Sequence, residues 1–338
     1  REIHPLSLPD ALPISSWRSA IRIAAADLPL AVGPAMSATL GLGWETDMFT
    51  ATLIGEALTR GDLSAAVDRL AAAGCAPGAA AWLDEGVAAD VPFTRDAAAG
   101  RGALEGAFAA TEVIVQPTAS RRKALLVADM DSTMITVECI DELADYAGIK
   151  AEVSAVTEAA MRGELDFEGA LDARVALLKG LSEDVIAQCL AERVTIMPGA
   201  KALVRTMRAQ GGHAVLVSGG FTRFAEPVAA EIGFDRAIAN VLLIENGRLT
   251  GTVAKPIVGS ATKEETLRAA IAERGIDPAL SLAVGDGAND LAMIGAAGLG
   301  VAYHAKPIVA AAAAARVDHG DLSALLYAQG YARKDWAA

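Results

Sequence analysis

Short apolar runs alternate with helical stretches through the last two thirds of this 338-residue chain, and this alternation is what most constrains the fold. Uncharged runs of a few residues fit buried strands, and helices between consecutive strands imply parallel crossover connections. The expected strands are 124–128, 214–217, 282–284 and 299–302, and the helices between them include 199–210, 221–232 and 263–274. We therefore predict an α/β fold with a doubly wound parallel sheet and a Rossmann-like core.

Three of the expected strands are followed directly by residues of the types found in catalytic and ligand-binding sites. These continuations are Asp129-Met130-Asp131-Ser132-Thr133, Ser218-Gly219-Gly220 and Gly285-Asp286-Gly287-Ala288-Asn289-Asp290. Each one alone is also typical of an ordinary turn or helix N-cap. Ligands of open α/β sheets bind beyond the carboxyl ends of the strands, so neighbouring strands would bring the three groups to one point. Together they predict a metal-dependent phosphoryl-transfer site.

Two aspartates of the first run suit a two-step transfer. Asp129, the first residue after the strand, is the expected nucleophile, because a carboxylate can take the phosphoryl group as an acyl phosphate. Asp131 is the expected general acid and base, since it protonates the leaving oxygen and then activates water.

Positive charge near the phosphate has to come from a cation and a few side chains. Mg²⁺ fits the oxygen-rich site, with side-chain ligands from Asp129 and Asp286 and the backbone carbonyl of Asp131. Lys263, Ser218 and Gly219 are expected to stabilise the transferring oxygens, because ammonium, hydroxyl and backbone N–H groups all donate to phosphate. Asp290 is expected to cap the following helix and to orient these ligands.

These motifs resemble the motif set of the haloacid dehalogenase-type phosphatases. The segments 138–144, 161–167 and 174–180 further resemble phosphoserine phosphatases, and the resemblance runs from about Lys123 to the C-terminus. It implies hydrolysis of O-phospho-L-serine to L-serine and phosphate through an aspartyl phosphate. This is the last step of serine biosynthesis, and the resemblance implies a cytoplasmic enzyme with Mg²⁺ as cofactor.

The same resemblance implies which residues bind the substrate. Glu138 and Arg174 would bind its amino and carboxylate groups, Met161 and Phe167 would line a lid, and Asn289 would contact the phosphate region. A zwitterionic amino acid needs one anion and one cation in its pocket, and arginine binds carboxylates bidentately. The alternative is that Glu138 and Arg174 are surface charges of the lid helices.

Composition divides the chain into three parts. We expect a non-native leader at 1–35 with initiation at Met36 or Met48, a small α/β domain at 36–117 and the phosphatase domain at 123–334. The small domain has a βαβ-like rhythm similar to the ACT fold that precedes the catalytic domain in several phosphoserine phosphatases. A mainly helical insert at about 137–196 would cover the strand ends as a cap.

Charge and cysteine content limit the partners. The formal net charge of −13 disfavours nucleic acid and membrane surfaces, and three widely spaced cysteines suit a reducing compartment. The oligomeric state is left open, with a homodimer as one option. Two other functions also stay open: a phosphotransferase that moves the phosphoryl group to an alcohol such as homoserine, and a non-catalytic amino-acid-binding regulator.

Overall fold

The computed structural model describes residues 48–161 and 164–337. All of these belong to one unit, Thr46–Ala338. The predicted leader at 1–35 lies outside the described residues, as does the side chain of Met161.

The N-terminal module is an antiparallel sheet with two helices. Its elements are β1 (Met48–Ile54), α1 (Arg60–Ala72), β2 (Ala76–Pro77), β3 (Ala81–Asp84), β4 (Ala88–Thr94), α2 (Ala97–Leu104) and β5 (Glu112–Pro117). The strand order is β2-β4-β1-β5, and β3 pairs with β4. The sheet and helices enclose a separate apolar core that includes Leu53, Leu70, Phe93 and Leu104. The sequence favours a helix over 96–110, but α2 already ends at Leu104, and the chain then turns through Gly106 at φ +72°.

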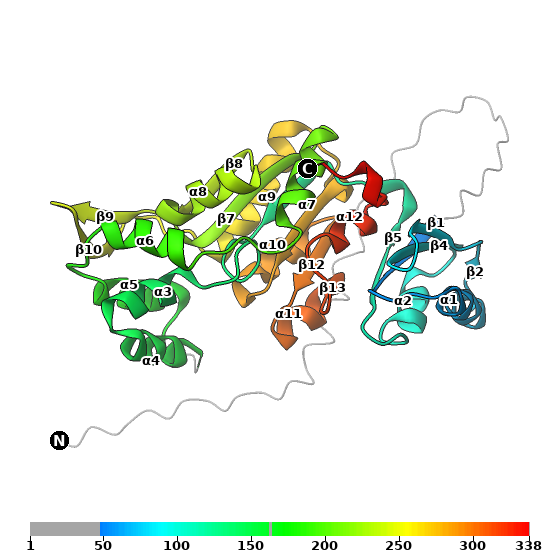
Figure 1. Ribbon diagram of the computed structural model, residues 1–338, viewed down its shortest axis with the longest axis horizontal. Coiled ribbons are helices and arrows are strands. Elements are labelled where there is room, and N and C mark those ends of the chain that lie inside the picture. Colours follow the sequence, from blue (N-terminus) through cyan, green and yellow to red (C-terminus); the bar gives the residue numbers. More distant parts are fainter. Residues whose placement is uncertain (1–47, 162–163, 338) are drawn as a thin grey trace, which may run out of the picture. The chain divides into compact units, whose positions relative to one another are not determined.

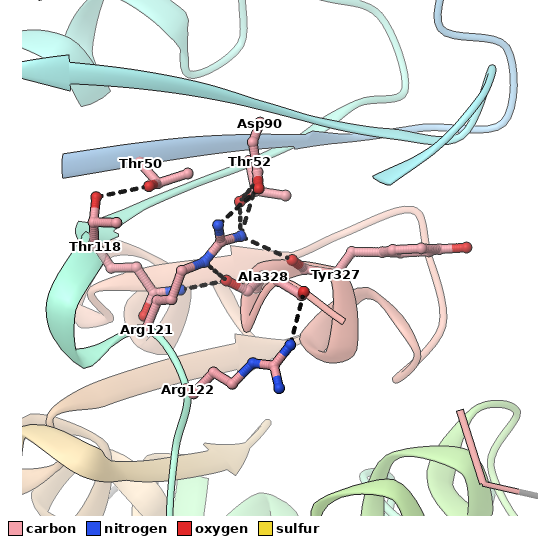
Figure 2. A network of polar contacts seen from close by, with 10 residues as sticks. Thr50, Thr52, Asp90, Thr118, Arg121, Arg122, Tyr327 and Ala328 are labelled. Carbon is pink, nitrogen blue, oxygen red and sulfur yellow. Dashed lines mark hydrogen bonds and ion pairs between the residues drawn. The ribbon is translucent and has the colours of Figure 1, made fainter. Parts of the chain in front are cut away.

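The sequence of segment 116–123 is typical of a linker between domains, but in the structure this segment makes specific contacts. Gln116 is the penultimate residue of β5, and its Nε2 donates to the Ala328 carbonyl at 2.7 Å. Arg121 pairs with Asp90 of β4 through both terminal nitrogens, at 2.7 and 2.9 Å. The Arg121 guanidinium also donates to Thr52 and to the carbonyls of Tyr327 and Ala328 (Figure 2). The segment therefore fastens the module to the end of the chain.

The second domain is built on a six-stranded parallel sheet. Its strands are β6 (Leu125–Ala128), β7 (His213–Phe221), β8 (Arg236–Asn240), β11 (Ser281–Gly285), β12 (Leu299–Tyr303) and β13 (Ala315–Val317), in the order β13-β12-β11-β6-β7-β8. The predicted doubly wound parallel sheet is confirmed. β8 and β13 were not predicted.

Side chains of the central strands alternate between two apolar layers, as the period of a strand requires. Leu126, Ala214 and Leu282 share a core with α7 (Ala200–Ala209), α8 (Thr222–Ile232) and α12 (Ala324–Ala328). Leu125 and Val215 contribute to a second core with α9 (Ser260–Arg274) and α10 (Leu291–Ala296). Helices thus cover both faces of the sheet, as Figure 1 shows. A short α11 (Pro307–Ala312) packs near β12.

The predicted helical insert follows β6 and ends before α7. It contains α3 (Cys139–Ala147), α4 (Lys150–Met161), α5 (Phe167–Leu177) and α6 (Asp184–Glu192). The hairpin β9 (Leu242–Glu245) and β10 (Arg248–Val253) turns at Asn246-Gly247, both at positive φ, as expected. The hairpin packs on this cap, since the Gly180 N–H donates to the Leu249 carbonyl at 2.8 Å (Figure 1). In the part of the chain that the structure describes, no helix has the length and apolarity needed to span a membrane.

Candidate active site

Three strand ends meet at one edge of the sheet. β6 lies between β7 and β11, and its last residue, Ala128, stands opposite Leu216 on one side and Val284 on the other. Because all three strands are parallel, the residues that follow them leave the same edge. The structure therefore brings together the three motifs that the sequence placed at separate strand ends.

Lys263 lies at the centre of the site. It stands in the first turns of α9 and is completely buried, and its Nζ lies 2.7 Å from Asp129 Oδ1 and 2.6 Å from Asp290 Oδ1. Burial alone would lower the pKa of the ammonium group, but the two carboxylates outweigh it and raise the pKa above its ordinary value. Lys263 therefore stays charged and neutralises part of the negative charge around it.

Asp129 is held through one oxygen. Its Oδ1 accepts the Met130 N–H at 2.8 Å in addition to the Lys263 ion pair, and its backbone N–H donates to the Val284 carbonyl at 3.0 Å. Both side-chain contacts fall on Oδ1, so Oδ2 is the oxygen left to face a substrate. The residue is 5% exposed, which limits competing contacts with water.

Asp131 has the properties of a proton carrier. Burial, and secondly the charge of Glu138, raise its pKa to about 7. Its Oδ1 is buried without a hydrogen-bond partner among the described residues. A Cβ at Gly220 would lie 2.9 Å from Asp131 Oδ2, so the Gly220 backbone passes close to this carboxylate. A group with a pKa near neutrality can both give and take a proton at physiological pH.

Ser132 connects the catalytic loop to the cap. It has a left-handed backbone at φ +55°, and its Oγ donates to Glu138 Oε1 at 2.9 Å. Glu138 is exposed and occupies the N-cap position of α3. The hydrogen bond therefore holds the predicted substrate-binding carboxylate at the mouth of the site.

Three carboxylates form a candidate metal centre. Asp129, Asp286 and Asp290 each offer an oxygen within 4.8 Å of the others. Burial, and then the charges of Asp290 and Glu138, raise the pKa of Asp286 to about 6. A hard divalent cation among these oxygens would relieve their repulsion, so the donor set fits Mg²⁺. Thr133 donates to Asp286 Oδ1 at 3.3 Å and orients it.

Ser218, Gly219 and Gly220 lie within β7, which runs to Phe221 and so extends beyond the strand 214–217 expected from the sequence; the register with β8 shifts between Val217 and Phe221. The Ser218 side chain is fully buried, and its Oγ accepts the Gly220 N–H at 2.8 Å. Phe167, at the start of α5, lies over this segment, because its ring is 3.1 Å from where a Cβ of Gly219 would stand. The same ring is 3.2 Å from a Cβ position at Gly259. The predicted lid residue Phe167 therefore reaches the predicted phosphate cradle.

The other predicted substrate-binding residues are Asn289 and Arg174, which lie on different elements. Asn289 sits in the turn after β11, and its Oδ1 lies where a Cβ at Gly287 would stand. Arg174 lies on α5 and its Nε donates to the Ala170 carbonyl at 3.2 Å, within its own helix. No ion pair of Arg174 is present among residues 48–161 and 164–337, so its charge is not satisfied by a described carboxylate.

Sequence comparisons agree with this geometry. The profile of the haloacid dehalogenase-like hydrolases matches residues 126–295, which contain every strand-end motif. The chain belongs to this family. Its members include relatives named phosphoserine phosphatase. One from Haemophilus influenzae is 49% identical over 202 residues, covering 60% of this chain and 64% of the relative. Another from Albidiferax ferrireducens is 49% identical over 207 residues, covering 60% of this chain and 87% of the relative.

A solved structure extends the likeness beyond the catalytic domain. The unliganded probable phosphoserine phosphatase from Vibrio cholerae superimposes with a TM-score of 0.68 at 33% identity. The match covers 86% of this chain and 88% of that one, so it extends into the N-terminal module. The family fold recognised from the sequence is confirmed.

The roles of two contributors to the site were not fully recognised from the sequence. Thr133 was part of the first motif but had no assigned role, although it is fully buried against Asp286. Asp290 was expected to orient ligands, but its ion pair with Lys263 was not foreseen. Thr133 could have been found from the sequence, because its hydroxyl group directly follows the Asp-x-Asp-Ser motif.

Proposed function

We propose that this chain hydrolyses O-phospho-L-serine to L-serine and phosphate. The observation that carries the proposal is the convergence of Asp129, Asp131, Lys263 and Asp286 at the adjacent ends of β6 and β11. The high identity to relatives named phosphoserine phosphatase supports the choice of substrate.

The first step is attack on phosphorus by Asp129. Lys263 and the Met130 N–H hold Oδ1, which leaves Oδ2 oriented for in-line attack. A P–O bond forms to Asp129 while the P–O bond to the serine oxygen breaks. Asp131, whose pKa is about 7, transfers its proton to that leaving oxygen.

The second step is hydrolysis of the aspartyl phosphate. Asp131 is now a carboxylate and takes a proton from the attacking water. The water oxygen forms a bond to phosphorus while the P–O bond to Asp129 breaks, so that Asp129 is regenerated and phosphate is released. The positive charge of Lys263 and the donors of the Ser218–Gly220 segment would stabilise the transferring oxygens in both steps.

Mg²⁺ would be held by the side chains of Asp129 and Asp286 and by the backbone carbonyl of Asp131. When bound, it supplies positive charge that screens the phosphate from the surrounding carboxylates. The crowded carboxylate oxygens of Asp129, Asp286 and Asp290 support this assignment.

The serine part of the substrate would lie between Glu138 and Arg174. Glu138 offers a carboxylate for the ammonium group, and Ser132 fixes it in place. Arg174 offers a guanidinium for the carboxylate, because no described acidic residue neutralises it. Phe167 and Met161 would close over the bound substrate from the cap.

The test is phosphate release from O-phospho-L-serine with Mg²⁺ present. We expect activity in the wild type and a loss of at least about 10³-fold in Asp129→Asn, since the amide is not a nucleophile. The matched control is Asp68→Asn, the same change at an exposed position on α1. Adding homoserine and looking for phosphohomoserine separates hydrolysis from alcohol transfer. An inactive wild type, or an active Asp129→Asn, would refute the proposal.

We also propose a cytoplasmic location. Cys75, Cys139 and Cys189 are buried free thiols, a state that suits a reducing compartment.

A further inference from the structure

Asn240 lies at the end of β8, next to the predicted phosphate cradle. It stands opposite Phe221 of β7 in the sheet register, and only 2% of it is exposed. A buried amide has to find hydrogen-bond partners, because an unpaired polar group away from water destabilises the fold. The partners that Asn240 finds are informative.

The Asn240 side chain forms hydrogen bonds to two separate segments at once. Its Nδ2 donates to the Gly219 carbonyl at 2.9 Å and to the Val258 carbonyl at 3.2 Å. Its Oδ1 accepts the Val258 N–H at 2.7 Å. Both amide protons and the carbonyl oxygen are therefore used, and the side chain is fixed in one orientation.

The first of these contacts reaches the cradle itself. The Gly219 carbonyl belongs to the same planar peptide as the Gly220 N–H, which donates to Ser218 Oγ. A hydrogen bond to this carbonyl therefore fixes the direction of the N–H as well. Two consecutive glycines have the greatest backbone freedom in the site, so an external anchor has the largest effect there.

The second pair of contacts reaches the segment before α9. Val258 immediately precedes Gly259, whose carbonyl accepts the N–H of Lys263 at 3.1 Å. Anchoring Val258 on both its N–H and its carbonyl fixes the start of the helix that carries the buried ammonium group. Asn240 thus connects the Ser218–Gly220 segment of β7 to the Lys263 helix.

We propose that Asn240 is a positioning residue for phosphoryl transfer. It does not touch the reacting atoms, and it sets the separation between the cradle and the Lys263 ammonium group. The inference rests on the proposed phosphate site but not on serine as the substrate. An aspartate in its place has the same shape, yet it cannot donate to the Gly219 and Val258 carbonyls and would repel both.

The experiment compares Asn240→Asp with a matched control, Gln329→Glu. Gln329 is also completely buried, and its amide likewise joins two segments, donating to the Leu325 carbonyl at 2.9 Å and accepting the Lys123 N–H at 3.1 Å. Both variants turn a buried amide into an acid, but only Asn240 adjoins the cradle. The measurements are the affinity for inorganic phosphate with Mg²⁺, the steady-state constants for O-phosphoserine and p-nitrophenyl phosphate, and the melting temperature.

We expect Asn240→Asp to weaken phosphate binding and to lower kcat/KM at least tenfold, by the same factor for both esters. Gln329→Glu should lower the melting temperature and keep phosphate affinity within twofold of wild type. Asn240→Ser keeps one short donor, so its phosphate affinity and kcat/KM should lie between those of Asn240→Asp and the wild type. It replaces Asn240→Asp in the comparison if that variant does not fold.

Several results would overturn the inference. Phosphate affinity within twofold of wild type in the Asn240 variants would do so, as would an equal loss of affinity in Gln329→Glu. Failure of the wild type on phosphoserine alone would refute the proposed substrate and leave the Asn240 comparison intact with p-nitrophenyl phosphate and inorganic phosphate.

Discussion

Removing the Arg121 side chain tests how the N-terminal module is attached. Arg121→Met keeps the apolar stem but deletes the bidentate pair with Asp90 and the three longer hydrogen bonds to Thr52, Tyr327 and Ala328. Both ionic side chains are 15% exposed, so the carboxylate that remains is largely shielded from water. Breaking a buried pair by removing one partner costs about 3–5 kcal/mol, and we take the lower value for this partly exposed site.

The expected result is a loss of about 3 kcal/mol in the free energy of unfolding, measured by urea denaturation with circular dichroism at pH 7. The matched control is Arg268→Met, which breaks an exposed pair with Glu264 one helical turn away and should cost about 0.5 kcal/mol or less. The double variant Arg121→Met with Asp90→Asn should be less destabilised than the sum of the two single changes.

A loss in Arg121→Met no larger than that in Arg268→Met would refute this reasoning. So would strict additivity of the Arg121 and Asp90 changes, because it would mean that the two side chains do not interact.

Three further predictions follow from the site and its surroundings. Arg174→Ala should raise the KM for O-phosphoserine by about 10- to 100-fold, the value of one charged hydrogen-bond pair, and leave p-nitrophenyl phosphate within twofold; equal losses would make Arg174 structural. Mg²⁺ should raise the melting temperature by relieving carboxylate repulsion, and Asp286→Asn should remove most of this increase; an unchanged increase would exclude Asp286 as a ligand. Burial lowers the pKa of Lys123 from 10.5 to about 8, so between these pH values the unfolded chain binds more protons and stability rises with pH. Lys123→Met should lose this rise, worth up to about 3 kcal/mol in urea titrations at pH 7.5 and 10; equal pH profiles would contradict the burial argument.

Most of the sheet could be predicted because its central strands are uninterrupted apolar runs. β6 and β11 are buried on both faces, and their sequences show this directly. β8 was missed since Arg236–Asn240 is short, begins with an exposed charge and lacks a clear apolar run. β4 of the N-terminal module was missed because it contains Asp90 and Pro92, which disfavour a strand.

Residues of the site were predictable where one motif carried its own chemistry. Asp129 and Asp286 follow apolar strands, and a carboxylate at a strand end is recognisable without a structure. Asn240 was not, since its role depends on the backbone carbonyls of Gly219 and Val258, which carry no side-chain signal. Arg121, outside the site, was not recognised either, because its partner Asp90 lies 31 residues away in the sequence. Contacts between a side chain and distant backbone groups are the hardest to predict from a sequence.

The order of the strands determines when the site assembles during folding. β7, β6 and β11 are neighbours in space, yet more than 80 residues separate β6 from β7 and the chain returns to β11 only after the hairpin and α9. Asp129, the Ser218–Gly220 segment and Asp286 therefore lie together only when these long-range pairings are complete, and such pairings form slowly. Catalytic competence should consequently appear late during refolding. A ligand that spans the three strand ends should protect the whole domain from unfolding, and not one loop alone.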